Sequence, residues 1–188
     1  MKTYFPGTTV ERNGENAEEF LMGIFSVTKG LMLAQVREIT GLDTPAIQNW
    51  INRGWVPKPV EKRYGAEHLA RILIINMLRG VMKLEQIAQL LSYINGSPEQ
   101  EPEQLITESQ LYCCLCEILD RVDFETVLTD SALTSEIKKA IGKYKENCPN
   151  TKRLVNGIHM ILVYYASSIV KRHADDMFNT VFQTGKTE

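Results

Sequence analysis

The chain has 188 residues and a formal net charge of -2, and 44% of its residues are hydrophobic and 23% charged. This is the balance of an ordinary globular protein, and it excludes a disordered or low-complexity chain. A chain of this length holds one large domain or two small ones.

Charge is distributed unevenly along the chain. Residues 31–96 hold 8 basic and 5 acidic side chains, a net charge of +3. Residues 1–30 hold 3 basic and 4 acidic side chains, and residues 97–188 hold 10 basic and 14 acidic ones. We therefore predict three parts: an N-terminal extension (1–30) with a short docking helix at 18–27, a central domain (31–96) and a helical C-terminal domain (97–188). A contact with phosphate groups is expected in the central domain.

The opening residues do not have the pattern of a signal peptide, because no long apolar run follows a basic start. We therefore expect a cytoplasmic protein. The longest uncharged stretch, Leu154 to Val170, is shorter than the roughly 20 residues that span a membrane and contains Asn156, His159 and two serines. We interpret it as a buried helix and expect no membrane contact. A helix that is apolar on nearly all sides lies at the centre of a bundle or in an oligomer interface.

The central domain begins with a pair of short helices. Helical spacing of apolar residues covers 34–42, after a short extended entry. The next helix has Asp43 or Thr44 as its N-cap and Pro45 in its first turn, where the missing N–H costs nothing. Gly54 marks its end.

Residues 58–64 are too short for a domain and predict a tight basic wing. A linker with glycine, prolines and acidic residues follows later, at 95–103. Further helices are predicted over residues 65–77, 84–94, 105–122, 132–145 and 151–181. Since every long periodic segment is helical, the predicted fold class is all-α, with extended structure only at the entry and the wing.

Four cysteines, Cys113, Cys114, Cys116 and Cys148, are expected to be reduced in an intracellular chain. A pair of them could hold zinc if Cys148 or a histidine joined it, but the sequence has no second pair with ligand spacing. We interpret them as small buried hydrophobes and predict no metal and no cofactor.

The block from Leu33 to Pro57 carries the functional signal. Two short helices joined at a glycine are typical of a helix-turn-helix, whose second helix enters the major groove of DNA. The outward residues of the second helix are predicted to be Thr44, Gln48, Asn49 and Asn52. Glutamine and asparagine can form two hydrogen bonds to an adenine edge. Phosphate contacts are predicted for the basic residues around the wing, Arg53, Lys58, Lys62 and Arg63.

Three ordered segments of the sequence, TGLDTPAIQNWINRGWVP, Lys62-Arg63-Tyr64 and AEHLARILIINMLRGVMKLEQIAQLL, resemble the MerR family. The resemblance covers about a third of the chain and implies a winged helix-turn-helix. It places the family's DNA contacts on Gln48 and Asn49 and its wing arginines on Lys62 and Arg63, while a structural aromatic position falls on Trp50. The glutamine replaces a charged contact, and the wing is shorter than in the family. The whole chain also resembles an uncharacterised bacterial family, the domain of unknown function eighteen thirty-six.

The last residue of the wing segment, Tyr64, is predicted to pack against the wing with its hydroxyl directed to a phosphate. The histidines are scattered, and the paired acidic residues fit solvated faces, so we predict no catalytic residues and no enzymatic activity.

The resulting functional hypothesis is a sequence-specific protein that binds double-stranded DNA, a bacterial transcription regulator. Pairing of two copies would have to come from the C-terminal helices. The alternative is a protein-interaction adaptor that keeps the winged fold without binding DNA, which the overall acidity favours. A small-molecule effector site is a third hypothesis; it rests only on the apolar segment 158–170, which fits plain core equally well.

Overall fold

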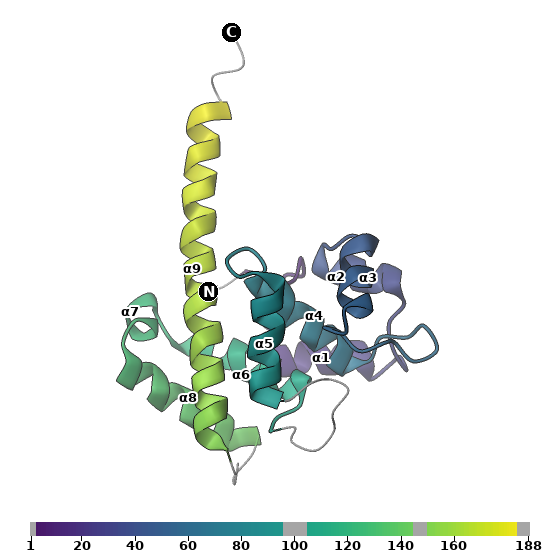
Figure 1. Ribbon diagram of the computed structural model, residues 1–188, viewed down its shortest axis with the longest axis horizontal. Helices are drawn as coiled ribbons and strands as arrows, with labels where there is room; N and C mark the ends of the chain where they lie inside the picture. Colours follow the sequence, from purple (N-terminus) through teal and green to yellow (C-terminus); the bar gives the residue numbers. More distant parts are fainter. Residues whose placement is uncertain (1–2, 96–104, 145–149, 184–188) are drawn as a thin grey trace.

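The computed structural model describes residues 3–95, 105–144 and 150–183 (Figure 1). Within these residues the chain is helical apart from turns and isolated antiparallel bridges. The helices are α1 (Ala17–Phe25), α2 (Leu33–Thr40), α3 (Thr44–Asn52), α4 (Ala66–Leu78), α5 (Leu84–Asn95), α6 (Glu108–Arg121), α7 (Phe124–Val127), α8 (Asp130–Tyr144) and α9 (Thr151–Gln183). The predicted all-α class is confirmed, and the predicted helices are found within a few residues of their expected ends. The short helix α7 was not predicted.

Helices α4 and α6 form the centre of the molecule. Helix α4 is buried on most of its circumference and packs along α6, while α2 packs on its other side. Helix α9 packs against α5, α8 and α4. The buried apolar residues form one connected core that runs from Phe5 to Ala166. This core includes residues on both sides of the boundary predicted near residue 96. Residues 96–103 of the predicted linker lie outside the described part of the chain.

The segment before α1 packs into the body, as does the helix itself. Phe5 is buried and stacks on Phe20 of α1, with 4.3 Å between the ring centroids. The hydroxyl of Tyr112 in α6 donates a 2.8 Å hydrogen bond to the carbonyl of Pro6. The sequence predicted only the docking helix, so this anchoring of the preceding loop is new.

Helix α9 differs from its prediction. Its first half presents one buried face to the body, but the opposite face is exposed, and residues 169–182 are exposed on all sides (Figure 1). The stretch Leu154 to Val170 is therefore a half-buried helix instead of a fully buried one. By length and composition alone, Thr151–Phe182 is the one helix among the described residues that could cross a membrane; 44% of its apolar window is buried inside the fold.

Candidate nucleic-acid interface

The turn between α2 and α3 is built around a glycine. Gly41 has φ of 68°, the left-handed conformation that glycine adopts without a steric penalty, and its N–H caps α2 on the carbonyl of Arg37. The hydroxyl of Thr40 donates to the carbonyl of Val36 at 2.7 Å and accepts from the N–H of Leu42 at 3.2 Å. These bonds satisfy the polar groups of a buried turn.

A side chain from α4 fixes the position of this turn. The amide of Asn76 donates to the carbonyl of Thr40 at 2.9 Å and to the carbonyl of Gly7 at 2.8 Å. One residue of the central helix thereby holds both the end of α2 and the N-terminal loop. The α2–α3 pair is consequently attached to the core at a defined angle.

Helix α3 has one apolar face and one polar face. The carboxylate of Asp43 caps its first turn by accepting from the N–H of Ala46 at 2.9 Å, which confirms the predicted start. Ile47 and Trp50 are fully buried against the core. Three of the predicted contact residues, Gln48, Asn49 and Asn52, are exposed together on the opposite face, and Thr44 is half-buried at the helix start. Residues three and four apart lie side by side on a helix, so the three amides form one surface.

The predicted wing is a tight hairpin. The N–H of Arg63 donates to the carbonyl of Val60 at 2.8 Å, and the two residues between them, Glu61 and Lys62, have φ of 50° and 61°. Two consecutive positive φ values are typical of the type I′ turn that joins strands in hairpins. Next to the turn, Tyr64 and Leu31 exchange two backbone hydrogen bonds of 2.9 Å. The extended entry before α2 is thus paired with the hairpin.

Glycine at position 30 permits this close pairing. Its φ is 146°, and a Cβ there would lie 3.0 Å from the Cβ of Arg63. The guanidinium of Arg63 donates to the carbonyl of Gly30 at 3.2 Å. On the other side of the hairpin, the ring of His68 accepts from the N–H of Gly65 through Nδ1, so its Nε2–H donates to the carbonyl of Lys58 at 3.2 Å. The base of the hairpin is therefore held by α4 and by the entry segment.

The basic residues of the hairpin are exposed, but its tyrosine is not. Lys58, Lys62 and Arg63 are all exposed. Tyr64 is only 4% exposed, and burial raises the pKa of its hydroxyl. Of the two roles predicted for Tyr64, packing fits this position, whereas contact with a phosphate does not, because the side chain lies in the core.

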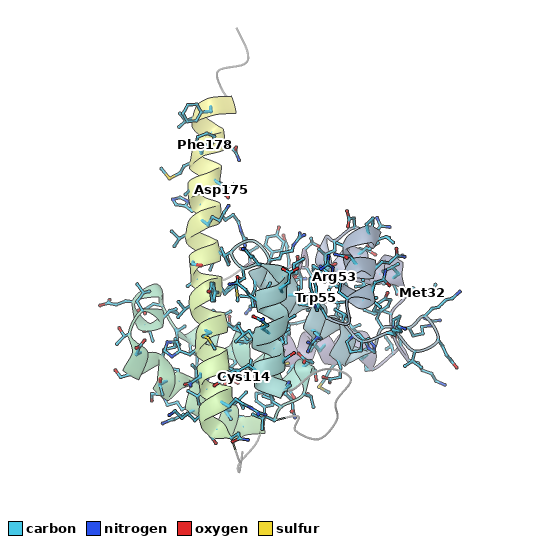
Figure 2. The ribbon with its side chains drawn as sticks, viewed as in Figure 1. Met32, Arg53, Trp55, Cys114, Asp175 and Phe178 are labelled. Atoms are coloured by element: carbon cyan, nitrogen blue, oxygen red, sulfur yellow. The ribbon has the colours of Figure 1, made fainter. Side chains whose placement is uncertain are left out.

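Arg53 lies between α3 and α5 and already has protein partners. Its guanidinium is 5.1 Å from the centroid of the Trp55 ring (Figure 2). Its Nε donates to Asn49 at 3.2 Å, and its Nη1 lies 3.4 Å from a carboxylate oxygen of Glu85. Arg53 is thus held beside the polar face of α3, and the same contact orients the amide of Asn49.

Sequence reasoning missed a buried ion pair beneath this surface. Arg71 of α4 and Glu108 of α6 lie 2.5 Å apart and are both buried. The Nε of Arg71 also donates to the carbonyl of Trp55, just after α3. Burial raises the pKa of the Glu108 carboxyl, and the neighbouring guanidinium opposes that rise. A single arginine within the apolar run LARILIIN of α4 was the signal that could have indicated a buried partner.

The cysteines of α6 are buried. Cys113, Cys114 and Cys116 carry free thiols, and burial raises the pKa of Cys113 and of Cys114 to about 12. Cys148 lies outside the described residues. Within the described ranges no group of three or more histidine, cysteine, aspartate or glutamate side chains is placed to hold a metal ion.

The part of the chain described here is an all-α assembly with a helix pair and a hairpin on one side. Residues 25–114, from the end of α1 into α6, match the model of a protein family described as a domain of unknown function, DUF1836. This match supports the resemblance to that family seen in the sequence and crosses the domain boundary predicted near residue 96. No curated protein and no solved structure matches the chain.

Proposed function

We propose that this protein binds double-stranded DNA in a sequence-specific manner, with α3 in the major groove and the hairpin against the phosphates, and that it regulates transcription. The observation that carries the proposal is the surface of α3, where Gln48, Asn49 and Asn52 are exposed together. Their side chains can read adenine edges in the major groove. A MerR-like winged helix-turn-helix is the finer form of this proposal, and the order of α2, α3 and the hairpin is compatible with it.

The hairpin would supply the electrostatic part of binding. Lys62 and Arg63 occupy a turn that the entry segment and α4 hold in place, so the backbone that carries them has a defined position relative to α3. Side chains that neutralise phosphates release counterions, which makes the affinity fall as salt rises. Arg53 adds a positive charge beside Asn49.

The direct test is selection of bound sequences from a random pool of duplex DNA with the purified full chain. We expect enrichment of a defined site. Gln48→Ala should lower affinity for that site by about tenfold to a hundredfold and relax the base preference at one position, because one good base contact contributes about 1–3 kcal/mol. Asn156→Ala, an exposed amide on α9, is the matched control and should bind as the wild type does.

Failure to enrich any site would contradict the proposal. It would favour the adaptor hypothesis, in which the same polar face of α3 contacts a protein.

A further inference from the structure

A cleft of about 840 Å³ opens between the N-terminal loop, the end of α4 and the second half of α9. Its walls come from residues 3–8, from residues 76–81 and from residues between 165 and 175. Asp175, labelled on α9 in Figure 2, marks the far end of the α9 wall. The volume lies in the range of small-molecule pockets, roughly 300–1,000 Å³. We call this space the α9 cleft.

The N-terminal wall of the α9 cleft is held by contacts with the body. Phe5 and Pro6 are buried. Gly7 has φ of 75°, and a Cβ there would clash with the carbonyl oxygen of Leu73 in α4. The amide of Asn76 donates to the carbonyl of Gly7 at 2.8 Å. This wall is thus already formed in the free protein, and a preformed site lowers the entropic cost of binding a ligand.

The α9 wall contains a tyrosine hydroxyl that has no protein partner. Tyr165, Ser168 and Arg172 line the cleft at spacings of three and four residues, so they lie on one face of the helix. Tyr165 is only 9% exposed, and its hydroxyl makes no hydrogen bond within the part of the chain that the structure describes. Burial raises the pKa of this hydroxyl, and the nearby guanidinium of Arg172 opposes that rise. Polar groups this deep are normally bonded, so the hydroxyl is free to donate to a molecule in the cleft.

Positive charge exceeds negative charge around the α9 cleft. Its basic lining residues are Arg79, Lys171 and Arg172. Among the described lining residues Asp175 is the one acidic side chain, and it is paired with Lys171 at 2.5 Å. Neither Arg79 nor Arg172 forms an ion pair with another described residue. Two guanidinium groups, one at the end of α4 and one on α9, are therefore available to a ligand.

These groups define the chemistry of the ligand. A guanidinium binds a carboxylate or a phosphate through two parallel hydrogen bonds. Two guanidinium groups and a hydroxyl match a group with three acceptor oxygens and two negative charges, and a phosphate monoester has both. Apolar side chains, among them Phe5, Met77 and Val81, line the rest of the cleft and fit the organic part of such a molecule.

The same lining argues against a cation as the ligand. Calcium and magnesium ions need several oxygen ligands. The carbonyls of Phe5, Pro6 and Gly7 already accept hydrogen bonds, and the carboxylate of Asp175 is paired. Two guanidinium groups without an acidic partner would also repel a positive charge.

We propose that the α9 cleft binds a small organic molecule that carries a phosphate monoester, with Arg79 and Arg172 on the phosphate oxygens and the hydroxyl of Tyr165 donating to one of them. The site uses the N-terminal loop, which lies outside the segments that resemble the MerR family. It shares no lining residue with α3 or the hairpin, so the proposal does not depend on DNA binding.

The test is isothermal titration calorimetry of the purified full chain with phenyl phosphate as the probe. We expect binding at millimolar or lower concentration, and none by phenol, which lacks the phosphate. Arg79→Gln and Arg172→Gln should each raise the dissociation constant by about tenfold, because each removes a charge-assisted contact. Tyr165→Phe removes only the hydroxyl and should raise it by about threefold to tenfold.

Lys152→Gln is the matched control, since it removes one exposed positive charge from α9 outside the cleft. It should bind phenyl phosphate as the wild type does. Far-ultraviolet circular dichroism checks that each variant is folded. The proposal is overturned if the wild type does not bind phenyl phosphate, if both arginine variants bind it normally, or if Lys152→Gln weakens binding equally. Displacement of the probe by duplex DNA or by vesicles containing phosphatidic acid would overturn the assignment to a small molecule.

Discussion

At the scale of single residues, Arg71 connects three parts of the fold through its side chain. It pairs with Glu108 and donates to the carbonyl of Trp55, so one buried side chain joins α4, α6 and the end of the α3 segment. A buried ion pair adds little net stability, because desolvation offsets the attraction, but a buried charge left alone is strongly unfavourable.

Removing one partner should therefore lower the free energy of unfolding more than removing both. We expect Arg71→Met to lower the free energy of unfolding by about 3–5 kcal/mol and the double variant Arg71→Met, Glu108→Leu to recover much of that loss. Unfolding in urea measures the stability of the wild type, of the two single variants Arg71→Met and Glu108→Leu, and of the double variant. Single and double effects that simply add would contradict the pairing.

The thiol of Cys114 should make stability depend on pH in the alkaline range. Its pKa rises from 9.0 to about 12 because it is buried, so the folded protein holds this proton more tightly than the unfolded chain. The stability that the protonated thiol contributes to the fold is complete below about pH 9. It is lost as the pH rises toward 12, by at most about 1.4 kcal/mol per pH unit. Between pH 8 and pH 11, the free energy of unfolding should fall more steeply with pH for the wild type than for Cys114→Ala. Parallel curves would show that this thiol titrates normally.

At the scale of elements, the turn between α2 and α3 sets the direction of the proposed recognition helix. Gly41 has positive φ, and a Cβ there would lie 2.9 Å from the methyl group of Thr9. Gly41→Ala should therefore destabilise the fold by about 1–2 kcal/mol and lower the melting temperature by several degrees. Gly142→Ala is the control, since α8 has open space at that position; it should stabilise the protein by about 0.5–1 kcal/mol. Equal effects of the two changes would rule out this account of the turn.

The elements themselves were largely predictable, because their signals are local. Apolar spacing identified α3 and its inward face, and Asp43 with Pro45 marked its start. The contacts that position α3 were not predictable in this way. Asn76 and Thr40 are 36 residues apart, and Tyr112 and Pro6 are 106 apart. No local pattern indicates such partners, so sequence reasoning identified the candidate surface but not what holds it. The exposure of the far face of α9 was missed for the same reason, since an apolar helix has the same pattern whether its partner is the core or another chain.

At the scale of the whole molecule, the α2–α3 pair and the projecting half of α9 lie apart. In Figure 1, α2 and α3 lie at the right of the view, and the second half of α9 projects upward, past the body, to the left of them. The net charge of -2 for the whole chain does not oppose the proposed contact of the α2–α3 pair with DNA, because residues 31–96 carry +3.

The measurement that tests the central claim most directly is the salt dependence of binding to a selected duplex. We predict that affinity falls linearly with salt on logarithmic axes, and that Lys62→Ala with Arg63→Ala weakens binding to all sequences and reduces the slope by about two. Lys138→Ala, an exposed lysine on α8, removes one charge away from the interface and should leave the slope unchanged. Binding that does not respond to salt, or a slope unaffected by loss of Lys62 and Arg63, would contradict the claim that this surface binds DNA.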